Sequence, residues 1–142
     1  MTWGMHTKDT PGKGRVLVVD DEENIRKLVR MSLTKAGYDV EEAENGEEAE
    51  KIIRAKDNPL MLDVILCDIR MPKVNGIEAI AFFQKQFPSV PIVVITGFPD
   101  TEMAVNLLKQ GVMDYVPKPI DSDKLLDVVS KAMAKRTSLK TD

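Results

Sequence analysis

Short apolar runs alternate with amphipathic stretches along the chain, and this alternation predicts its secondary structure. The apolar runs have the length of strands and are rich in Val and Ile, whereas the stretches between them carry apolar residues at helical spacing. Glycine or proline ends most of the amphipathic stretches, as is typical of helix boundaries. The predicted strands are 16–19, 38–43, 62–68, 91–97 and 113–117, and the predicted helices are 22–37, 45–59, 75–88, 100–111 and 121–135.

The regular order of strand and helix predicts the fold class. A strand, a helix and the next strand form a right-handed crossover, so the strands lie parallel in one sheet with helices on both faces. Such a sheet is buried on both faces, which explains the apolar runs in strands 16–19, 62–68 and 91–97. The length of 142 residues fits a single domain with one core. We therefore expect a doubly wound α/β domain.

Composition and charge narrow the classes of function. The net charge is −3, so the chain lacks the basic surface that binds a phosphate backbone, and we expect no direct nucleic acid ligand. No apolar run approaches the roughly 20 residues of a membrane span, and residues 1–14 lack the apolar centre of a secretory signal. These features predict a cytoplasmic protein without membrane contact. The single cysteine, Cys67, lies in an apolar run and is interpreted as a small buried residue.

Polar residues follow four of the predicted strands, at the point where each strand ends. They are Asp20 and Asp21 after the first strand, Asp68 at the end of the third, Thr96 at the end of the fourth and Lys118 after the fifth. Ligands of doubly wound folds bind beyond the carboxyl ends of the strands. Three carboxylates at one edge repel one another unless a cation lies among them, and carboxylates without His or Cys suit Mg²⁺. The pattern predicts a magnesium site at this edge.

Each of these residues also has an ordinary structural interpretation. Consecutive acids after a strand are common in the first turn of a helix, where the helix dipole favours Asp and Glu. We assign Glu22 and Glu23 to that turn. Taken singly, Thr96, Lys118 and Tyr115 are typical of a strand end, a surface lysine and an amphipathic strand. Only the combination of residues at several strand ends favours a functional site.

Four motifs in combination carry a resemblance to a known family. They are "VVDDE" after the first strand, "CDIRMPKVNG" after the third, "ITG" after the fourth and "VPKPI" after the fifth. From about Arg15 to Lys135, the chain resembles the response-regulator receiver domains of two-component signalling. The resemblance implies a flavodoxin-like (βα)5 fold, with a five-stranded parallel sheet in the order 2-1-3-4-5. It also divides the chain into a flexible leader (1–14), a receiver domain (15–135) and a tail or start of a linker (136–142).

The resemblance implies a function in signal transfer. Asp68 matches the aspartate that accepts a phosphoryl group from a sensor histidine kinase or phosphotransfer protein. Lys118 and Thr96 match the lysine and the switch hydroxyl that contact this group, and Tyr115 matches the switch aromatic. The surface formed by the fourth helix, the fifth strand and the fifth helix then changes, which controls a downstream partner, an output domain or a homodimer. Such a module catalyses only its own phosphorylation and dephosphorylation and is otherwise not an enzyme.

The resemblance also implies how magnesium is held. Its ligands are Asp20, Asp21, Asp68 and the backbone carbonyl of Arg70, with Asp20 acting partly through water. The bond between Lys118 and Pro119 is a candidate cis peptide, an assignment that rests on the family and not on the dipeptide.

Two other classes of protein share parts of this pattern. A flavodoxin-like flavin binder has the same fold but needs a hydroxyl-rich phosphate loop after the first strand, where "DDEEN" repels a phosphate. A Mg²⁺-dependent hydrolase with an aspartyl nucleophile is expected to carry a second acid two residues after Asp68, where this chain has Arg70. The connection before the third strand is also longer than the usual short turn. It either packs locally or carries Leu60 and Met61 outward toward a partner.

Overall fold

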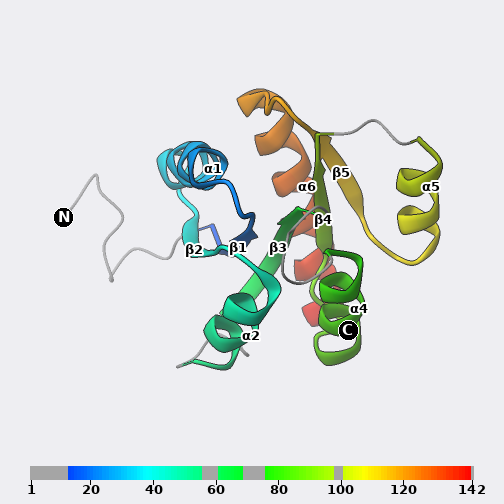
Figure 1. Cartoon of the computed structure of the whole chain (residues 1–142). Helices are drawn as coiled ribbons and strands as arrows, with labels where there is room; N and C mark the ends of the chain where they lie inside the picture. Colours follow the sequence, from blue (N-terminus) through cyan, green and yellow to red (C-terminus); the bar gives the residue numbers. More distant parts are fainter. Residues whose placement is uncertain (1–12, 56–60, 69–75, 98–100, 142) are drawn as a thin grey trace.

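The computed structural model describes residues 13–55, 61–68, 76–97 and 101–141 (Figure 1). Most of the predicted leader lies outside these ranges, as do the Arg70 carbonyl and most of the long connection before the third strand, including Leu60. Among the described helices, none combines the length and the apolar character that crossing a bilayer demands.

Five parallel strands form one sheet in the order β2-β1-β3-β4-β5 (Figure 1). The strands are β1 (Arg15–Val19), β2 (Asp39–Ala43), β3 (Leu62–Asp68), β4 (Ile92–Thr96) and β5 (Asp114–Pro117). All five predicted strands are present, with bounds close to those that the apolar runs indicate. The observed order confirms the doubly wound α/β class and the flavodoxin-like order 2-1-3-4-5 that the resemblance implies.

Helices cover both faces of this sheet (Figure 1). They are α1 (Glu23–Lys35), α2 (Gly46–Arg54), α4 (Gly76–Gln86), α5 (Thr101–Lys109) and α6 (Ser122–Thr141). Leu17 and Val19 of β1 belong to the apolar cluster that packs under α2, α4 and α5, whereas Val16 and Val18 belong to the cluster under α1 and α6. Because β1 buries side chains on both faces, it is apolar without a break.

The last helix extends beyond its predicted end at Lys135 and runs to Thr141. The cause lies at Arg136, whose side chain is almost fully buried. Its Nη1 donates hydrogen bonds to the carbonyl (3.2 Å) and the Oγ (2.6 Å) of Ser89, and its Nε lies 3.7 Å from Asp63 Oδ1. These contacts hold α6 against the sheet past the point where the apolar pattern stops. Where a receiver domain ends and a linker begins stays a prediction.

The strand register brings the polar strand ends together. Val19 of β1 pairs with Cys67 of β3, so Asp20 and Asp68 are neighbours on adjacent strands. Thr96 of β4 pairs with Pro117 of β5, which places Lys118 beside the end of β4. The parallel arrangement therefore gathers residues from four strands at one edge of the sheet, as the sequence predicts.

Candidate functional site

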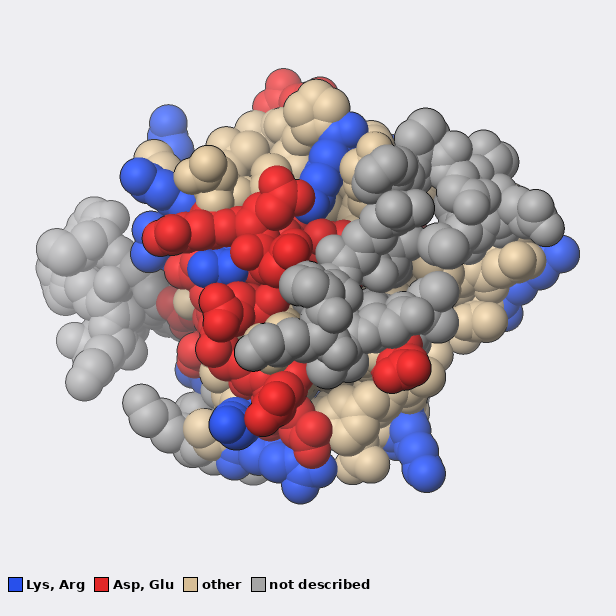
Figure 2. Space-filling view, viewed as in Figure 1, with Lys and Arg blue, Asp and Glu red and all other residues tan. Residues whose placement is uncertain are grey.

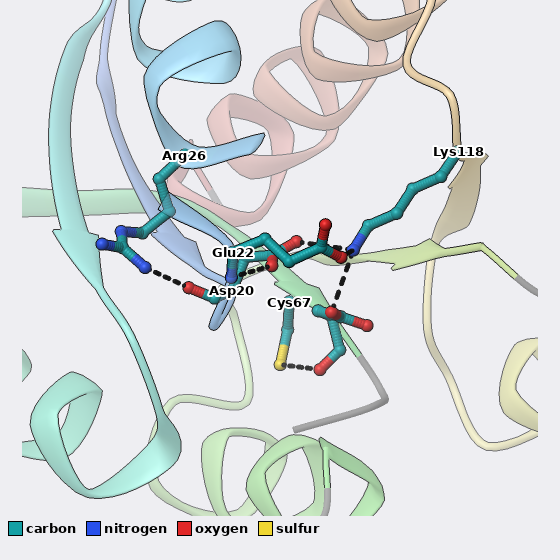
Figure 3. Close-up of polar contacts among 6 residues, drawn as sticks. Asp20, Glu22, Arg26, Cys67 and Lys118 are labelled. Atoms are coloured by element: carbon teal, nitrogen blue, oxygen red, sulfur yellow. Dashed lines mark hydrogen bonds and ion pairs between the residues drawn. The ribbon is translucent and has the colours of Figure 1, made fainter. Parts of the chain in front are cut away.

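The centre of the site is a buried pair of carboxylates with one ammonium between them. Asp20 is 0% exposed and Asp68 is 2% exposed. Lys118 Nζ lies 3.1 Å from Asp20 Oδ2, 3.1 Å from Asp68 Oδ2 and 2.7 Å from Glu22 Oε1 (Figure 3). Lys118 reaches these groups from the end of β5, across the edge of the sheet. The structure thus joins three of the predicted site residues by direct contacts.

A fourth acid, Asp21, completes a carboxylate cluster at this edge. Asp20, Asp21, Glu22 and Asp68 each offer an oxygen atom, and these atoms all lie within 4.8 Å of one another. Asp21 and Glu22 face solvent, whereas Asp20 and Asp68 form the buried floor of the cluster. The cluster therefore has an open side through which a ligand can enter.

Burial alters the acidity of Asp20. Its pKa is raised from the ordinary value to about 6, chiefly by loss of water around the carboxyl group and also by the charge of Asp68. The Glu22 backbone N–H donates a 2.8 Å hydrogen bond to Asp20 Oδ1, which together with Lys118 opposes this rise. Asp20 Oδ2 is buried and accepts no hydrogen bond from the described residues, although it pairs electrostatically with Lys118.

The ammonium of Lys118 is held firmly in its charged form. Burial alone lowers the pKa of a lysine, but the hydrogen bonds to Glu22 and Asp68 and the contact with Asp20 outweigh it and raise the pKa of Lys118 above its usual value. The Lys118 backbone N–H also donates a 2.8 Å hydrogen bond to the Thr96 carbonyl, and the Lys118–Pro119 bond is cis. The backbone of this lysine is therefore fixed against the end of β4.

Thr96 and Tyr115 lie on the two strands beside this centre. Thr96 ends β4 and is 7% exposed, so its side chain is enclosed at the edge of the sheet. Tyr115 lies on β5 and is 40% exposed. The structure places Thr96 next to Lys118 through the backbone and leaves Tyr115 at the surface.

Cys67 precedes Asp68 but belongs to the core. It is fully buried, and its Sγ contacts the Asp68 carbonyl at 3.5 Å. Burial and the charges of Asp68 and Asp20 raise the pKa of the thiol, so it stays protonated and unreactive. The interpretation of Cys67 as a small buried residue is confirmed.

The surface around the site carries a strong negative charge. Figure 2 shows Asp and Glu side chains gathered in one band over the region where Figure 1 draws the carboxyl ends of β1 and β2 and the start of α2. Its exposed acids are Asp21, Glu22, Glu23, Glu44, Glu47 and Glu48. An anionic substrate that approaches this region needs cations to offset the repulsion.

Comparison with known proteins identifies the family. A family model described as "Response regulator receiver domain" matches residues 16–130, which include every candidate site residue. The chain belongs to this family. The receiver domain is 34% identical over 121 residues to the DNA-binding transcriptional regulator NtrC of Proteus hauseri, and 37% identical over 123 residues to the transcriptional regulatory protein ZraR of Salmonella typhimurium.

These alignments cover 85% and 87% of this chain but only 25% and 27% of the two relatives, so the chain spans about a quarter of their length. Solved structures share the fold. A receiver domain protein from Clostridium thermocellum has a TM-score of 0.82 at 27% identity, with 89% of this chain and 98% of that chain covered. NtrX from Brucella abortus, in complex with ADP, has a TM-score of 0.82 at 28% identity, with 89% of this chain and 28% of that chain covered.

Two residues that the sequence analysis did not single out take part in this receiver site. Glu22 was expected only as a first-turn helix residue, yet its side chain makes the shortest contact with Lys118. Arg26, in the first half of α1, donates a 2.6 Å hydrogen bond from Nη1 to the Asp20 carbonyl (Figure 3). Its Nε lies 3.5 Å from Glu42 Oε1. Arg26 thereby ties the loop after β1 to both α1 and β2. The only feature of the sequence that could have assigned Glu22 to the site is its position directly after Asp20 and Asp21.

Proposed function

We propose that this receiver domain accepts a phosphoryl group on Asp68 from a phosphohistidine of a sensor histidine kinase or phosphotransfer protein. The observation that supports this most directly is the position of Asp68, a nearly buried carboxylate between the acidic cluster and the Lys118 ammonium, 3.1 Å away. Phosphoryl transfer asks chiefly for alignment and for neutralisation of charge, and this arrangement offers both. Membership of the receiver family supports the same assignment.

The reaction is a displacement at phosphorus. An oxygen of the Asp68 carboxylate attacks the phosphorus atom and forms a mixed acyl phosphate. The bond between phosphorus and the donor imidazole nitrogen breaks, and the nitrogen keeps the electron pair and takes up a proton from water. Lys118 lies close enough to Asp68 to donate a hydrogen bond to a phosphoryl oxygen, and the hydroxyl of Thr96, at the end of the adjacent strand β4, is a candidate second donor.

The residues present fit a magnesium ion. The cluster contains only carboxylate ligands, which suit a hard cation, and the buried Asp20 Oδ2 lacks a hydrogen-bond donor among the described residues. Asp20, Asp21 and Asp68 would hold the ion, together with the Arg70 carbonyl, which lies outside the described residues. When bound, Mg²⁺ supplies positive charge that offsets the charge of the phosphoryl group.

The output of the domain is proposed to be a change in the surface of α5, β5 and α6. Val105 and Leu108 of α5 and Tyr115 of β5 are large apolar residues that are about 40% exposed there. Because the match covers only 25% of the curated relative NtrC, which is named as a transcriptional regulator, we infer that this surface controls a downstream partner or an output domain, or forms a homodimer. The cytoplasmic location and the lack of a direct nucleic acid ligand stay predictions from composition.

The flavin-binder and hydrolase alternatives lead to different experimental results. A flavin binder is expected to purify with a yellow chromophore, and a hydrolase is expected to turn over a phosphomonoester. The flavin binder lacks support because acids follow β1 where a flavin phosphate needs hydroxyl groups, and the hydrolase lacks support because Arg70 stands where its second acid is expected. Either result would replace the proposed function.

Intact mass spectrometry tests the proposal. After incubation with Mg²⁺ and a small phosphodonor such as acetyl phosphate, the wild-type chain is expected to gain one phosphoryl group and Asp68→Asn none, because an amide lacks the nucleophilic anion. Asp127→Asn, an exposed acid of α6, is the matched control and is expected to be labelled like the wild type. Equal labelling of Asp68→Asn and the wild type would show that the phosphate sits elsewhere.

A further inference from the structure

Glu22 holds the Lys118 ammonium at the mouth of the site. Its Oε1 lies 2.7 Å from Lys118 Nζ, the shortest of the three carboxylate contacts of this lysine. The Glu22 side chain is 56% exposed, whereas the side chains of Asp20 and Asp68 are 0% and 3% exposed. Lys118 is therefore bound on one side by the buried floor and on the other by a residue that faces solvent (Figure 3).

Three carboxylates surround the ammonium, and two of them accept hydrogen bonds from it. A lysine has three N–H donors, and Lys118 makes hydrogen bonds to Glu22 and Asp68 and a charge contact with Asp20. A phosphoryl oxygen on Asp68 is a further anionic acceptor for this ammonium, so it competes with the carboxylates that already hold Lys118. Release of Glu22 is the least costly, because its exposed carboxylate regains water, whereas Asp20 stays buried.

The backbone of Glu22 is fixed in a way that leaves its side chain available for this contact. Glu22 is the N-cap residue of α1, but its side chain makes no capping hydrogen bond. Its backbone N–H donates to Asp20 Oδ1 at 2.8 Å, and its carbonyl accepts from the Ile25 and Arg26 N–H groups, both at 3.1 Å. The first turn of the helix thus holds the backbone, and the carboxylate is directed to Lys118.

We propose that Glu22 is a positioning residue that holds Lys118 before phosphoryl transfer and competes with the phosphoryl group for its ammonium. This inference rests on the proposed function of Asp68 and Lys118. Removal of the Glu22 carboxylate frees a donor of Lys118 for an incoming anionic phosphodonor. The expected effect is a lower half-saturating concentration of phosphodonor, because the contact that is lost involves the exposed Glu22 carboxylate and not the buried floor.

The matched comparison is Glu22→Gln against Glu23→Gln. Both variants remove one negative charge at the start of α1, but Glu23 lies outside the carboxylate cluster. The first measurement uses the full chain without phosphodonor. The NMR signal of the Lys118 ammonium is expected to shift or broaden in Glu22→Gln and to stay unchanged in Glu23→Gln.

The second measurement is the rate of Asp68 labelling at saturating Mg²⁺ and increasing acetyl phosphate. The half-saturating concentration is expected to fall roughly two- to fivefold more in Glu22→Gln than in Glu23→Gln, the range that follows from loss of one ion pair with a solvent-exposed carboxylate. The Mg²⁺ affinity, measured by calorimetry, is expected to change equally in both variants.

Three results overturn the inference in distinguishable ways. Equal half-saturating concentrations in the two variants show that Glu22 does not compete for Lys118. A much larger loss of Mg²⁺ affinity in Glu22→Gln identifies Glu22 as a metal ligand instead, since its oxygen lies within 4.8 Å of the other carboxylates. A wild-type chain that accepts no phosphate on Asp68 overturns the proposed function, and this inference with it.

Discussion

Lys118 Nζ and Asp20 Oδ2 lie 3.1 Å apart, yet this buried oxygen accepts no hydrogen bond from the described residues. The hydrogen bonds of the ammonium go to Glu22 and Asp68, and its contact with Asp20 is an ion pair. The buried carboxyl group of Asp20 thus accepts a hydrogen bond from the Glu22 N–H at Oδ1, whereas its Oδ2 has only the charge contact with Lys118. Such a group lowers the stability of the fold when it is ionised, so it tends either to be protonated or to bind a cation.

The first prediction concerns the pH dependence of stability without Mg²⁺. Asp20 has a pKa of about 6 in the fold, raised chiefly by burial, so the folded chain binds a proton more tightly than the unfolded chain. The contribution of Asp20 to the free energy of unfolding is fully present below the ordinary pKa of Asp and is lost as the pH rises through 6. Asp21, Glu22 and Asp68 face Asp20 with negative charge, and Lys118 faces it with positive charge.

Asp20→Asn removes the cost of ionising this buried carboxyl group. With a chelator present to remove Mg²⁺, the variant and the wild type are expected to have nearly the same free energy of unfolding at pH 4. At pH 7 the variant is expected to be more stable by up to about 3 kcal/mol. Urea unfolding at several pH values measures this difference, with Asp127→Asn as the control for loss of an acid on the surface. A difference that does not change with pH would mean that Asp20 does not titrate in this range.

The second prediction concerns magnesium. Asp21→Asn removes an exposed oxygen ligand from the cluster and is expected to weaken Mg²⁺ binding at least about tenfold, the lower limit seen even for outer-shell partners of metals. Phosphorylation at limiting Mg²⁺ is expected to fall with it. Without Mg²⁺ the variant is expected to be more stable, because repulsion among the carboxylates is reduced. Calorimetric titration against Glu23→Gln tests this, and equal affinities would remove Asp21 from the metal site.

The third prediction concerns Arg136, far from the site. Arg136→Met leaves the Asp63 carboxylate without its buried arginine and Ser89 without two hydrogen bonds, so we expect a loss of about 3 kcal/mol in the free energy of unfolding. Lys135→Met is the matched control on the exposed side of α6, and its effect is expected to stay within about 0.5 kcal/mol. Urea unfolding compares the two variants. Similar effects in both would show that Arg136 does not anchor the helix.

These residues also show which parts of the structure the sequence predicts. Strands β1, β3 and β4 are buried on both faces, so their apolar runs mark them without further information. Alternation with helices then predicts a parallel sheet whose strand ends meet, which is enough to bring Asp20, Asp68 and Lys118 together. The strand order itself came from the family resemblance, because periodicity does not encode it.

The partners of Glu22 and Arg136 could not be predicted in this way. Glu22 fits the pattern of a first helical turn, and its true partner, Lys118, lies 96 residues further along the chain. Arg136 looks like the start of a polar tail, because an arginine is rarely buried without a partner and its partners lie near β3 and β4. In both cases the local sequence predicts an ordinary surface role for the residue. Its actual role depends on a contact with a segment far away in the chain, which the local sequence does not reveal.

The last prediction concerns the path from Asp68 to the surface. Thr96 is enclosed at the end of β4, and its carbonyl accepts the Lys118 N–H, so the threonine lies between the site and β5. If a phosphoryl group draws the Thr96 hydroxyl toward it, space opens behind β4 and Tyr115, now 40% exposed, can turn inward. Such a shift needs only a few kcal/mol, about what charge-assisted hydrogen bonds supply.

Thr96→Ala is therefore expected to accept phosphate on Asp68 but to transmit it poorly. In the wild type, phosphorylation is expected to shift backbone amide NMR signals from about residue 98 to residue 128, across α5, β5 and the first half of α6. In Thr96→Ala these shifts are expected to be much smaller, whereas Thr96→Ser, which keeps the hydroxyl, is expected to retain most of them. Identical shifts in Thr96→Ala and the wild type, or shifts confined to the neighbours of Asp68, would mean that the Thr96 hydroxyl does not link phosphorylation to this surface.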